Sequence, residues 1–212
     1  MRYSMRWLAG VVLLVGAPLG AQDARLEQRL DAATAARVGA IVDSARAAGL
    51  PTRPLTSKAL EGASKGAPGA RIIAAVSRLA QGLRSARDVL GPSTDAELDA
   101  AASALMLGVR AEEVAAVRGA RSGERLTVPL AVLADLVAYG VPSDAATQAV
   151  VQLAGRSEDE ALLDFRRDVE RDIALGAPPA AAAAVRLNSA GRLESDLTTQ
   201  QIGIPPPKPR KP

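Results

Sequence analysis

Four short breaks of similar form divide this sequence into pairs of helical segments. The breaks are residues 66–68 (Gly-Ala-Pro), 108–110 (Gly-Val-Arg), 140–142 (Gly-Val-Pro) and 176–178 (Gly-Ala-Pro), spaced by 42, 32 and 36 residues. Glycine favours the left-handed conformation found at helix ends, and proline suits the start of the following helix. Such spacings are typical of helix-pair repeats that stack into solenoids. The sequence therefore predicts an all-α protein, either a short stack of helical hairpins or an irregular helical bundle.

The clearest hairpin lies between Pro54 and Leu90. Its first helix begins near Pro54 and ends at Gly66, and its second helix runs from Pro68 to the Gly91-Pro92 pair. In the second helix, apolar residues recur at steps of three and four, which predicts one wide buried stripe. That stripe comprises Ile72, Ile73, Val76, Leu79, Ala80, Leu83, Ala86 and Leu90.

The remaining helices are predicted from their apolar periodicity and from their capping residues. We expect one helix over residues 22–48 and an Ala-rich helix from residue 178 to about residue 187. Side chains that accept hydrogen bonds from the first turn mark helix starts. The predicted caps are Thr94 with Glu97, Thr127, Ser143, and Ser157 with Glu160.

The first residues resemble a secretory signal peptide. Arg2 and Arg6 precede an apolar run from Trp7 to about Leu19, and a small residue, Ala21, follows. A bilayer-spanning helix needs about 20 apolar residues, so cleavage after Ala21 is favoured over an uncleaved membrane anchor. We therefore expect export to the periplasm or the exterior, with no transmembrane span after cleavage. The expected organisation is a signal peptide (1–21), a helical domain (22–190) and a disordered, Pro-rich basic tail (191–212).

The composition restricts both the core and the available chemistry. The chain has no cysteine and no histidine, and only Tyr139 and Phe165 are aromatic after residue 21. A core of Leu, Val, Ile and Ala follows, and alanine allows helices to approach closely. Disulfides, structural zinc sites and Ser-His-Asp or Cys-His catalysis are excluded. Nucleic-acid binding is also disfavoured because stacking aromatics are absent.

Two motif matches in the first hairpin have structural explanations. Residues 62–66 match G-x-S-x-G, but the serine hydrolase elbow requires a preceding strand and a histidine base. Lys65 follows a glycine-rich turn that could hold an anion, but the Walker spacing is absent. We interpret both matches as parts of a plain helix–turn–helix.

Carboxylates provide the remaining options for chemistry. Glu160, Asp164, Asp168 and Asp172 lie four residues apart and form a stripe that could bind calcium. However, Arg167 and Arg171 follow Asp164 and Asp168 by three residues, so a salt-bridged, solvated face is the favoured interpretation.

A carboxylate-dependent hydrolase would need a positioned acid in a cleft. Glu61 and the Glu112–Glu113 pair are the candidates for such a residue. Aromatic platforms, which usually line sugar-binding clefts, are almost absent. The sequence therefore predicts no catalytic, cofactor-binding or metal-binding residues.

Charge is distributed unevenly along the chain. Residues 53–90 carry seven basic and two acidic residues, for a net charge of +5, whereas residues 91–172 carry eight basic and fifteen acidic residues, for −7. Attraction between helices of one molecule is one explanation, and head-to-tail self-association is another.

A resemblance adds to this interpretation. The pattern GLP…PL..KALEGASKGAP..RI..AV..LA, mainly within residues 41–90 and more weakly within 126–178, resembles uncharacterised exported Ala-rich proteins of bacteria. The resemblance implies export and helical structure but carries no catalytic residues.

The leading hypothesis is a non-enzymatic, exported helical protein that binds other envelope proteins or itself and acts as an interaction or scaffolding module. The alternatives are a carboxylate-dependent envelope hydrolase and a carrier of lipids or small molecules in a slot between Ala-lined helices.

Overall fold

The computed structural model describes residues 26, 28–121, 123–155 and 158–202. This part of the chain is helical throughout and contains no strand. The helices in the described residues are α2 (Ala32–Ala47), α3 (Arg53–Ser64), α4 (Gly69–Leu90), α5 (Asp95–Met106), α6 (Ala111–Ala120), α7 (Thr127–Ala138), α8 (Ser143–Ala154), α9 (Asp159–Ala174) and α10 (Pro179–Ile202).

The helices form an elongated stack of two layers. Helices α2, α4, α6, α8 and α10 pack in succession in one layer, and α5, α7 and α9 do the same in the other. Each even-numbered helix from α4 onward also packs against the odd-numbered helix before it. Helix α4 has 22 residues and contacts both α3 and α5. The all-α prediction is confirmed, and the arrangement is the stack of hairpins.

The predicted breaks share one hydrogen-bonding pattern. In the α3–α4 turn, the Gly66 N–H donates to the Ala63 carbonyl and the Ala67 N–H donates to the Gly62 carbonyl. Gly66 has a φ of 64°, which a residue with a side chain rarely adopts. The same bond pair closes the turns at residues 49, 108, 140 and 176. One local device, the Schellman motif, thus ends five helices of the stack.

The core consists mainly of leucine, valine and alanine. Every residue of the stripe predicted on α4 is buried except Ile73, which is half-buried. The single phenylalanine, Phe165, is 5% exposed and lies in the same core. Buried alanines such as Ala101 and Ala102 allow α5 to lie close to its neighbours.

Arginine side chains connect the ends of successive helices. Arg87 of α4 donates to the Gly49 carbonyl at 3.1 Å, and Arg118 of α6 donates to the Val89 carbonyl at 3.1 Å. Carbonyls at helix ends have no intrahelical partner, and arginine is a suitable donor to them. These bonds fix the position of each helix end relative to the next helix in the same layer.

The predicted caps are only partly correct. The Thr94–Glu97 capping box is confirmed. Thr127 and Ser143 do not cap: α7 and α8 begin at these residues, and the preceding Leu126 and Pro142 occupy the N-cap positions without side-chain hydrogen bonds. Ser157 lies outside the described residues.

Two predicted boundaries also differ from the structure. We expected one continuous helix over residues 22–48. Instead, α2 begins at Ala32, because the Asp31 side chain caps it by accepting from the Thr34 N–H at 2.9 Å. Helix α10 extends to Ile202, past residue 191, where we expected the tail to begin. Residues 191–202 contain no proline and include good helix formers, so the helix continues through them. The expected signal peptide (1–21) and residues 203–212 lie outside the described residues.

No helix in the described ranges is long and apolar enough to cross a membrane.

Candidate functional site

Glu61, one of the predicted candidate acids, is held in two ion pairs. Lys58 lies 2.8 Å and Lys65 2.5 Å from its carboxylate oxygens. Hydrogen bonds from these two lysines lower the pKa of Glu61 to about 2. A general acid needs a pKa close to the working pH, so the surroundings of Glu61 do not suit that role.

The Glu112–Glu113 pair is also engaged by neighbouring groups. Glu112 is exposed and pairs with Arg110 at 2.8 Å. Glu113 is buried and accepts from the Arg110 backbone N–H at 2.8 Å and from the Ser143 hydroxyl at 3.2 Å. Its carboxylate connects the start of α6 to the start of α8, which is a structural role.

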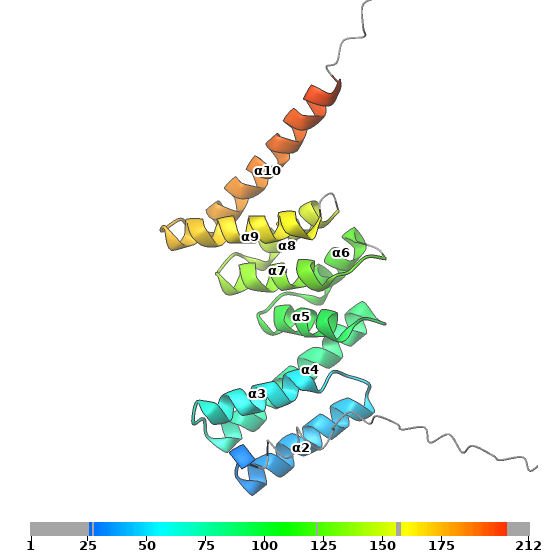
Figure 1. Ribbon diagram of the computed structural model, residues 1–212, viewed down its shortest axis with the longest axis vertical. Helices are drawn as coiled ribbons and strands as arrows, with labels where there is room; N and C mark the ends of the chain where they lie inside the picture. The colour runs from blue at the N-terminus through cyan, green and yellow to red at the C-terminus, as the bar shows by residue number, and fades with distance from the viewer. Residues whose placement is uncertain (1–25, 27, 122, 156–157, 203–212) are drawn as a thin grey trace, which may run out of the picture.

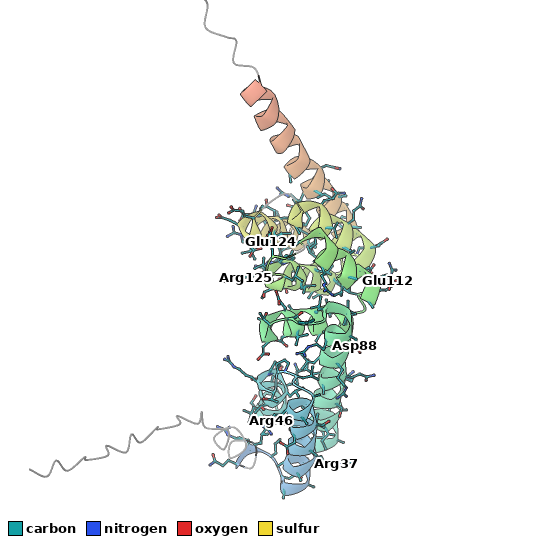
Figure 2. All side chains as sticks on the ribbon, turned by 90° about the vertical axis from the view of Figure 1, so that its right-hand side faces the viewer. Arg37, Arg46, Asp88, Glu112, Glu124 and Arg125 are labelled. Carbon is teal, nitrogen blue, oxygen red and sulfur yellow. The ribbon has the colours of Figure 1, made fainter. Side chains whose placement is uncertain are left out.

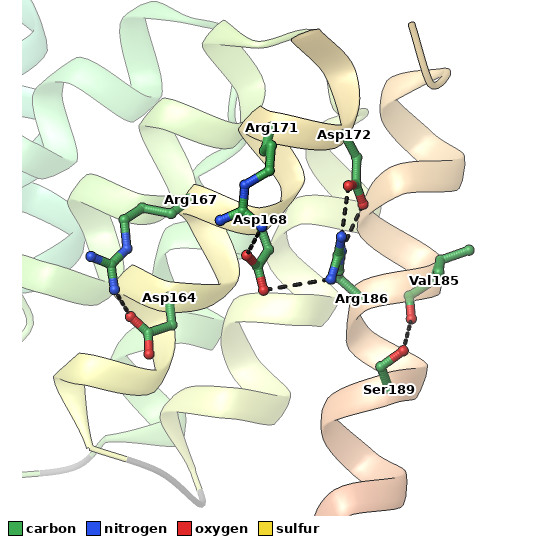
Figure 3. Close-up of polar contacts among 8 residues, drawn as sticks. All are labelled: Asp164, Arg167, Asp168, Arg171, Asp172, Val185, Arg186 and Ser189. Carbon is green, nitrogen blue, oxygen red and sulfur yellow. Dashed lines mark hydrogen bonds and ion pairs between the residues drawn. The ribbon is translucent and has the colours of Figure 1, made fainter. Parts of the chain in front are cut away.

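The acidic stripe of α9 is salt-bridged, as the spacing predicted. Asp164 pairs with Arg167, and Asp168 pairs with Arg171 at 2.9 Å (Figure 3). Arg186 of α10, which the spacing within α9 could not indicate, completes the cluster. It donates two hydrogen bonds to Asp172, at 2.6 and 2.7 Å, and lies 3.6 Å from Asp168. Among the described residues, no group of three acidic side chains is arranged to hold a metal ion.

The G-x-S-x-G match is explained by packing. A Cβ on Gly62 would lie 2.8 Å from Cγ1 of Ile72, so this glycine allows α3 to approach α4. The Ser64 hydroxyl donates to the Glu61 carbonyl at 2.8 Å. Together with the positive φ of Gly66, these contacts account for the whole motif.

A cavity of about 570 Å³ lies where the loops before α5 and α7 meet the end of α6. Its charged lining residues serve the fold. Glu97 accepts from the Leu126 N–H at 2.8 Å, Arg118 donates to the Val89 carbonyl, and Arg121 donates to the Ala154 carbonyl at 3.2 Å. These groups hold the stack together, so the cavity presents little free charge.

A second groove, of about 420 Å³, separates α3 from α5 above Leu79 of α4. It places Glu61 and Lys58 on one wall and Asp99 and Met106 on the other. Burial raises the pKa of Asp99. Sequence reasoning missed Asp99, because nothing in its local pattern distinguishes it from a solvent-facing acid. Among the described residues, the Asp99 carboxylate forms no ion pair, and on the opposite wall Glu61 is already paired with Lys58.

The third groove, of about 300 Å³, lies between α2 and α4. We call it the basic groove. Its lining consists of Arg37, Ala40, Ile41 and Ser44 of α2, and Ile73, Ser77, Ala80 and Arg84 of α4.

Helices α2 and α4 run parallel along the basic groove. Gly69 lies against Thr34 where both helices begin, and Arg87 reaches the Gly49 carbonyl where both end. Arg37 therefore lies towards the start of the groove and Arg84 towards its end. Apolar residues and two serines lie between the arginines.

Both groove arginines are exposed, and no carboxylate of the described residues forms an ion pair with either of them. This differs from α9, where the described arginines Arg166, Arg167 and Arg171 each pair with an aspartate. The basic excess of residues 53–90 was visible in the sequence, but the groove was not, because it also needs α2. Unpaired arginines beside an apolar floor make the basic groove the strongest candidate site.

Comparisons of the chain with protein-family models, with curated proteins and with solved structures find no match.

Proposed function

We propose that this chain is an exported, non-enzymatic interaction module that binds another protein of the cell envelope through the basic groove. The observation that carries the proposal is the pair of unpaired arginines, Arg37 and Arg84, at the two ends of an apolar floor. Charged residues with no partner in their own molecule, next to apolar surface, are suited to a partner that supplies the opposite charge.

The form of the molecule supports a binding role. Stacked helical hairpins create extended surfaces with grooves between helices, and such surfaces serve binding in many solenoids. The candidate acids Glu61 and Glu113 take part in ion pairs and hydrogen bonds of the fold. The apolar run with Arg2 and Arg6 at the N-terminus supports export.

Site-specific photocrosslinking in intact cells tests the proposal. A photoreactive residue at Ser77, inside the basic groove, is compared with one at Gln148, an exposed position of α8. We expect one discrete adduct from Ser77 in the envelope fraction and none from Gln148. An adduct of twice the chain's mass would identify a second copy as the partner. The proposal fails if Ser77 gives no adduct, or if both positions give the same products.

A further inference from the structure

The spacing of charge along the basic groove defines what it can bind. Arg37 lies three residues after Thr34 in α2, and Arg84 lies fifteen residues after Gly69 in the parallel helix α4, where Gly69 contacts Thr34. The two arginines are therefore offset by about twelve residues along the helices, a rise of about 18 Å at about 1.5 Å per residue. The two guanidinium groups therefore mark the ends of a groove three helical turns long.

We infer that the basic groove receives an amphipathic helix of a partner protein that carries carboxylates at positions i and i+11. This inference rests on the proposed function and specifies the partner of the same site. Eleven residues make close to three full turns, so both carboxylates lie on the same face of the docked helix. Small apolar residues at i+4 and i+7 on that face contact the floor.

The floor supplies the apolar part of the contact. Ala40, Ile41, Ile73 and Ala80 line the groove between the arginines, and Ser44 and Ser77 add only small side chains. A third helix laid along two others fits this shape, with its apolar face in the groove. Each arginine then pairs with a carboxylate, an interaction that guanidinium makes with two parallel hydrogen bonds.

The same observations disfavour other occupants. A phospholipid with a single phosphate would engage one arginine and leave the other unpaired. A nucleic acid strand would place phosphates along an apolar floor that has no aromatic side chain for stacking. A helix with two separated carboxylates uses both charged ends and the apolar middle.

A designed peptide tests the inference. The probe is an 18-residue synthetic helix with Glu at i and i+11 and with Ala and Leu on the face between them. Its binding to the purified full chain is measured by fluorescence anisotropy. Arg37→Glu and Arg84→Glu are each expected to weaken binding at least tenfold. Arg78→Glu, which makes the same charge change on α4 outside the groove lining, is expected to change it less than twofold.

A charge-reversed pair provides the decisive comparison. The double variant Arg37→Glu/Arg84→Glu should bind a peptide with Lys at i and i+11 and reject the original peptide. If Arg78→Glu weakened peptide binding as much as the groove variants do, the binding would reflect unspecific charge attraction, and the inference would be overturned. Binding of phosphatidylglycerol vesicles that depends on Arg84, with no peptide binding, would also overturn it and identify a lipid site.

The two proposals fail in distinguishable ways. If Ser77 crosslinks a partner in cells and the double variant retains that adduct, the interaction module stands and the acidic helix is wrong. If the peptides obey the charge reversal but Ser77 gives no adduct in cells, the groove chemistry stands and the proposed envelope function is wrong.

Discussion

Gly69 lies at a close contact between the start of α4 and the start of α2. A Cβ at this position would overlap Oγ1 of Thr34 and lie 3.3 Å from its Cβ. Thr34 is 4% exposed, and its backbone N–H is bound to the Asp31 carboxylate. A buried β-branched side chain has few alternative rotamers. The parallel alignment of α2 and α4, and with it the basic groove, therefore depends on the missing side chain of Gly69.

Gly69→Ala is expected to lower the free energy of unfolding by about 1–3 kcal/mol, the usual cost of adding a methyl group to a closely packed site. Gly39→Ala is the matched control. Gly39 lies inside α2, and a Cβ there would have no neighbouring atom within 4 Å, so alanine should stabilise by about 0.5–1 kcal/mol. Urea denaturation of both variants measures the difference. A Gly69→Ala chain as stable as the parent would contradict the close approach.

The sequence reveals why a glycine is needed when the reason is local, but not when the reason is a contact with another helix. The break at Gly66 was predictable because glycine and the following Ala67-Pro68 form one local signal. The roles of Gly62 and Gly69 depend on contacts with other helices, with Ile72 and Thr34 respectively. The neighbours of Gly69 in the sequence carry no information about Thr34, so its role could not be predicted.

Two buried glutamates connect successive helices within a layer. Glu97 accepts from the Thr94 N–H at 2.9 Å through one oxygen and from the Leu126 N–H at 2.8 Å through the other, which ties α5 to the start of α7. Glu113 makes the corresponding connection from α6 to Ser143 at the start of α8. In both α5 and α6, the glutamate at the third helical position thus accepts a hydrogen bond at the start of its own helix and another at the start of the next helix in the layer.

The sequence predicted half of this arrangement. The T-x-x-E spacing identified Glu97 as a capping residue, because both partners lie within four residues. The second oxygen bonds to Leu126, 29 residues away, and this contact exists only once α5 and α7 pack. The predicted caps Thr127 and Ser143 were wrong for the same reason. Ser143 instead donates to Glu113 of another helix, and Glu97 supplies an acceptor just before Thr127.

Glu97 makes the stability of this junction depend on pH. Burial acts to raise the pKa of Glu97, but hydrogen bonds from Leu126 and Thr94 outweigh burial, and the pKa lies below the ordinary value of 4.5. The ionised form therefore stabilises the fold above pH 4.5, and this contribution is lost as the pH falls through the lower folded pKa.

Glu97→Gln is expected to lower the free energy of unfolding at pH 7 by about 1–3 kcal/mol, because the amide NH2 faces a backbone N–H and leaves a buried donor unpaired. The deficit should shrink as the pH falls below 4.5 and through the lower folded pKa, because the parent chain then also loses the charge. Thermal melts between pH 2 and pH 7 measure both effects, with Glu112→Gln at an exposed position as the control. A deficit that is constant over this pH range would show that ionisation of Glu97 does not stabilise the junction.

On the scale of the whole molecule, charge varies along the stack. The basic part, 53–90, comprises α3 and α4 and is continued by Arg37 of α2, which Figure 2 labels, whereas the acidic part begins at α5. The two parts meet where α4 packs against α5, the most extensive helix contact of the stack. The sequence revealed this uneven charge, and the fold turns it into a separation in space. Attraction across the α4–α5 boundary is thus available within one molecule, while the basic groove at the far end stays unpaired.

A stack of hairpins should lose stability in steps when it is shortened from one end. In repeat proteins, stability is approximately a sum of terms for each repeat and for its contacts with neighbours. Helix α10 contributes buried Ala182 and Ala183, half-buried Leu187 and Ala190, and the Arg186 pairs with α9. The described side chains of α10 that pack against the core thus lie within residues 179–190, although the helix continues to Ile202 and projects beyond α9 (Figure 1).

Two truncations test this description. A chain that ends at Ala190 is expected to melt within about 2 °C of the full chain, because the packed half of α10 is retained. A chain that ends at Leu175 loses all of α10, and we expect a loss of roughly 3 kcal/mol from the exposed apolar surface, or roughly 6–12 °C in Tm. Differential scanning calorimetry measures both. An equal drop in the two chains would mean that residues 191–212 account for the whole loss and that residues 176–190 add nothing, which would contradict this description. The expected difference would place the end of the cooperative unit within residues 176–190.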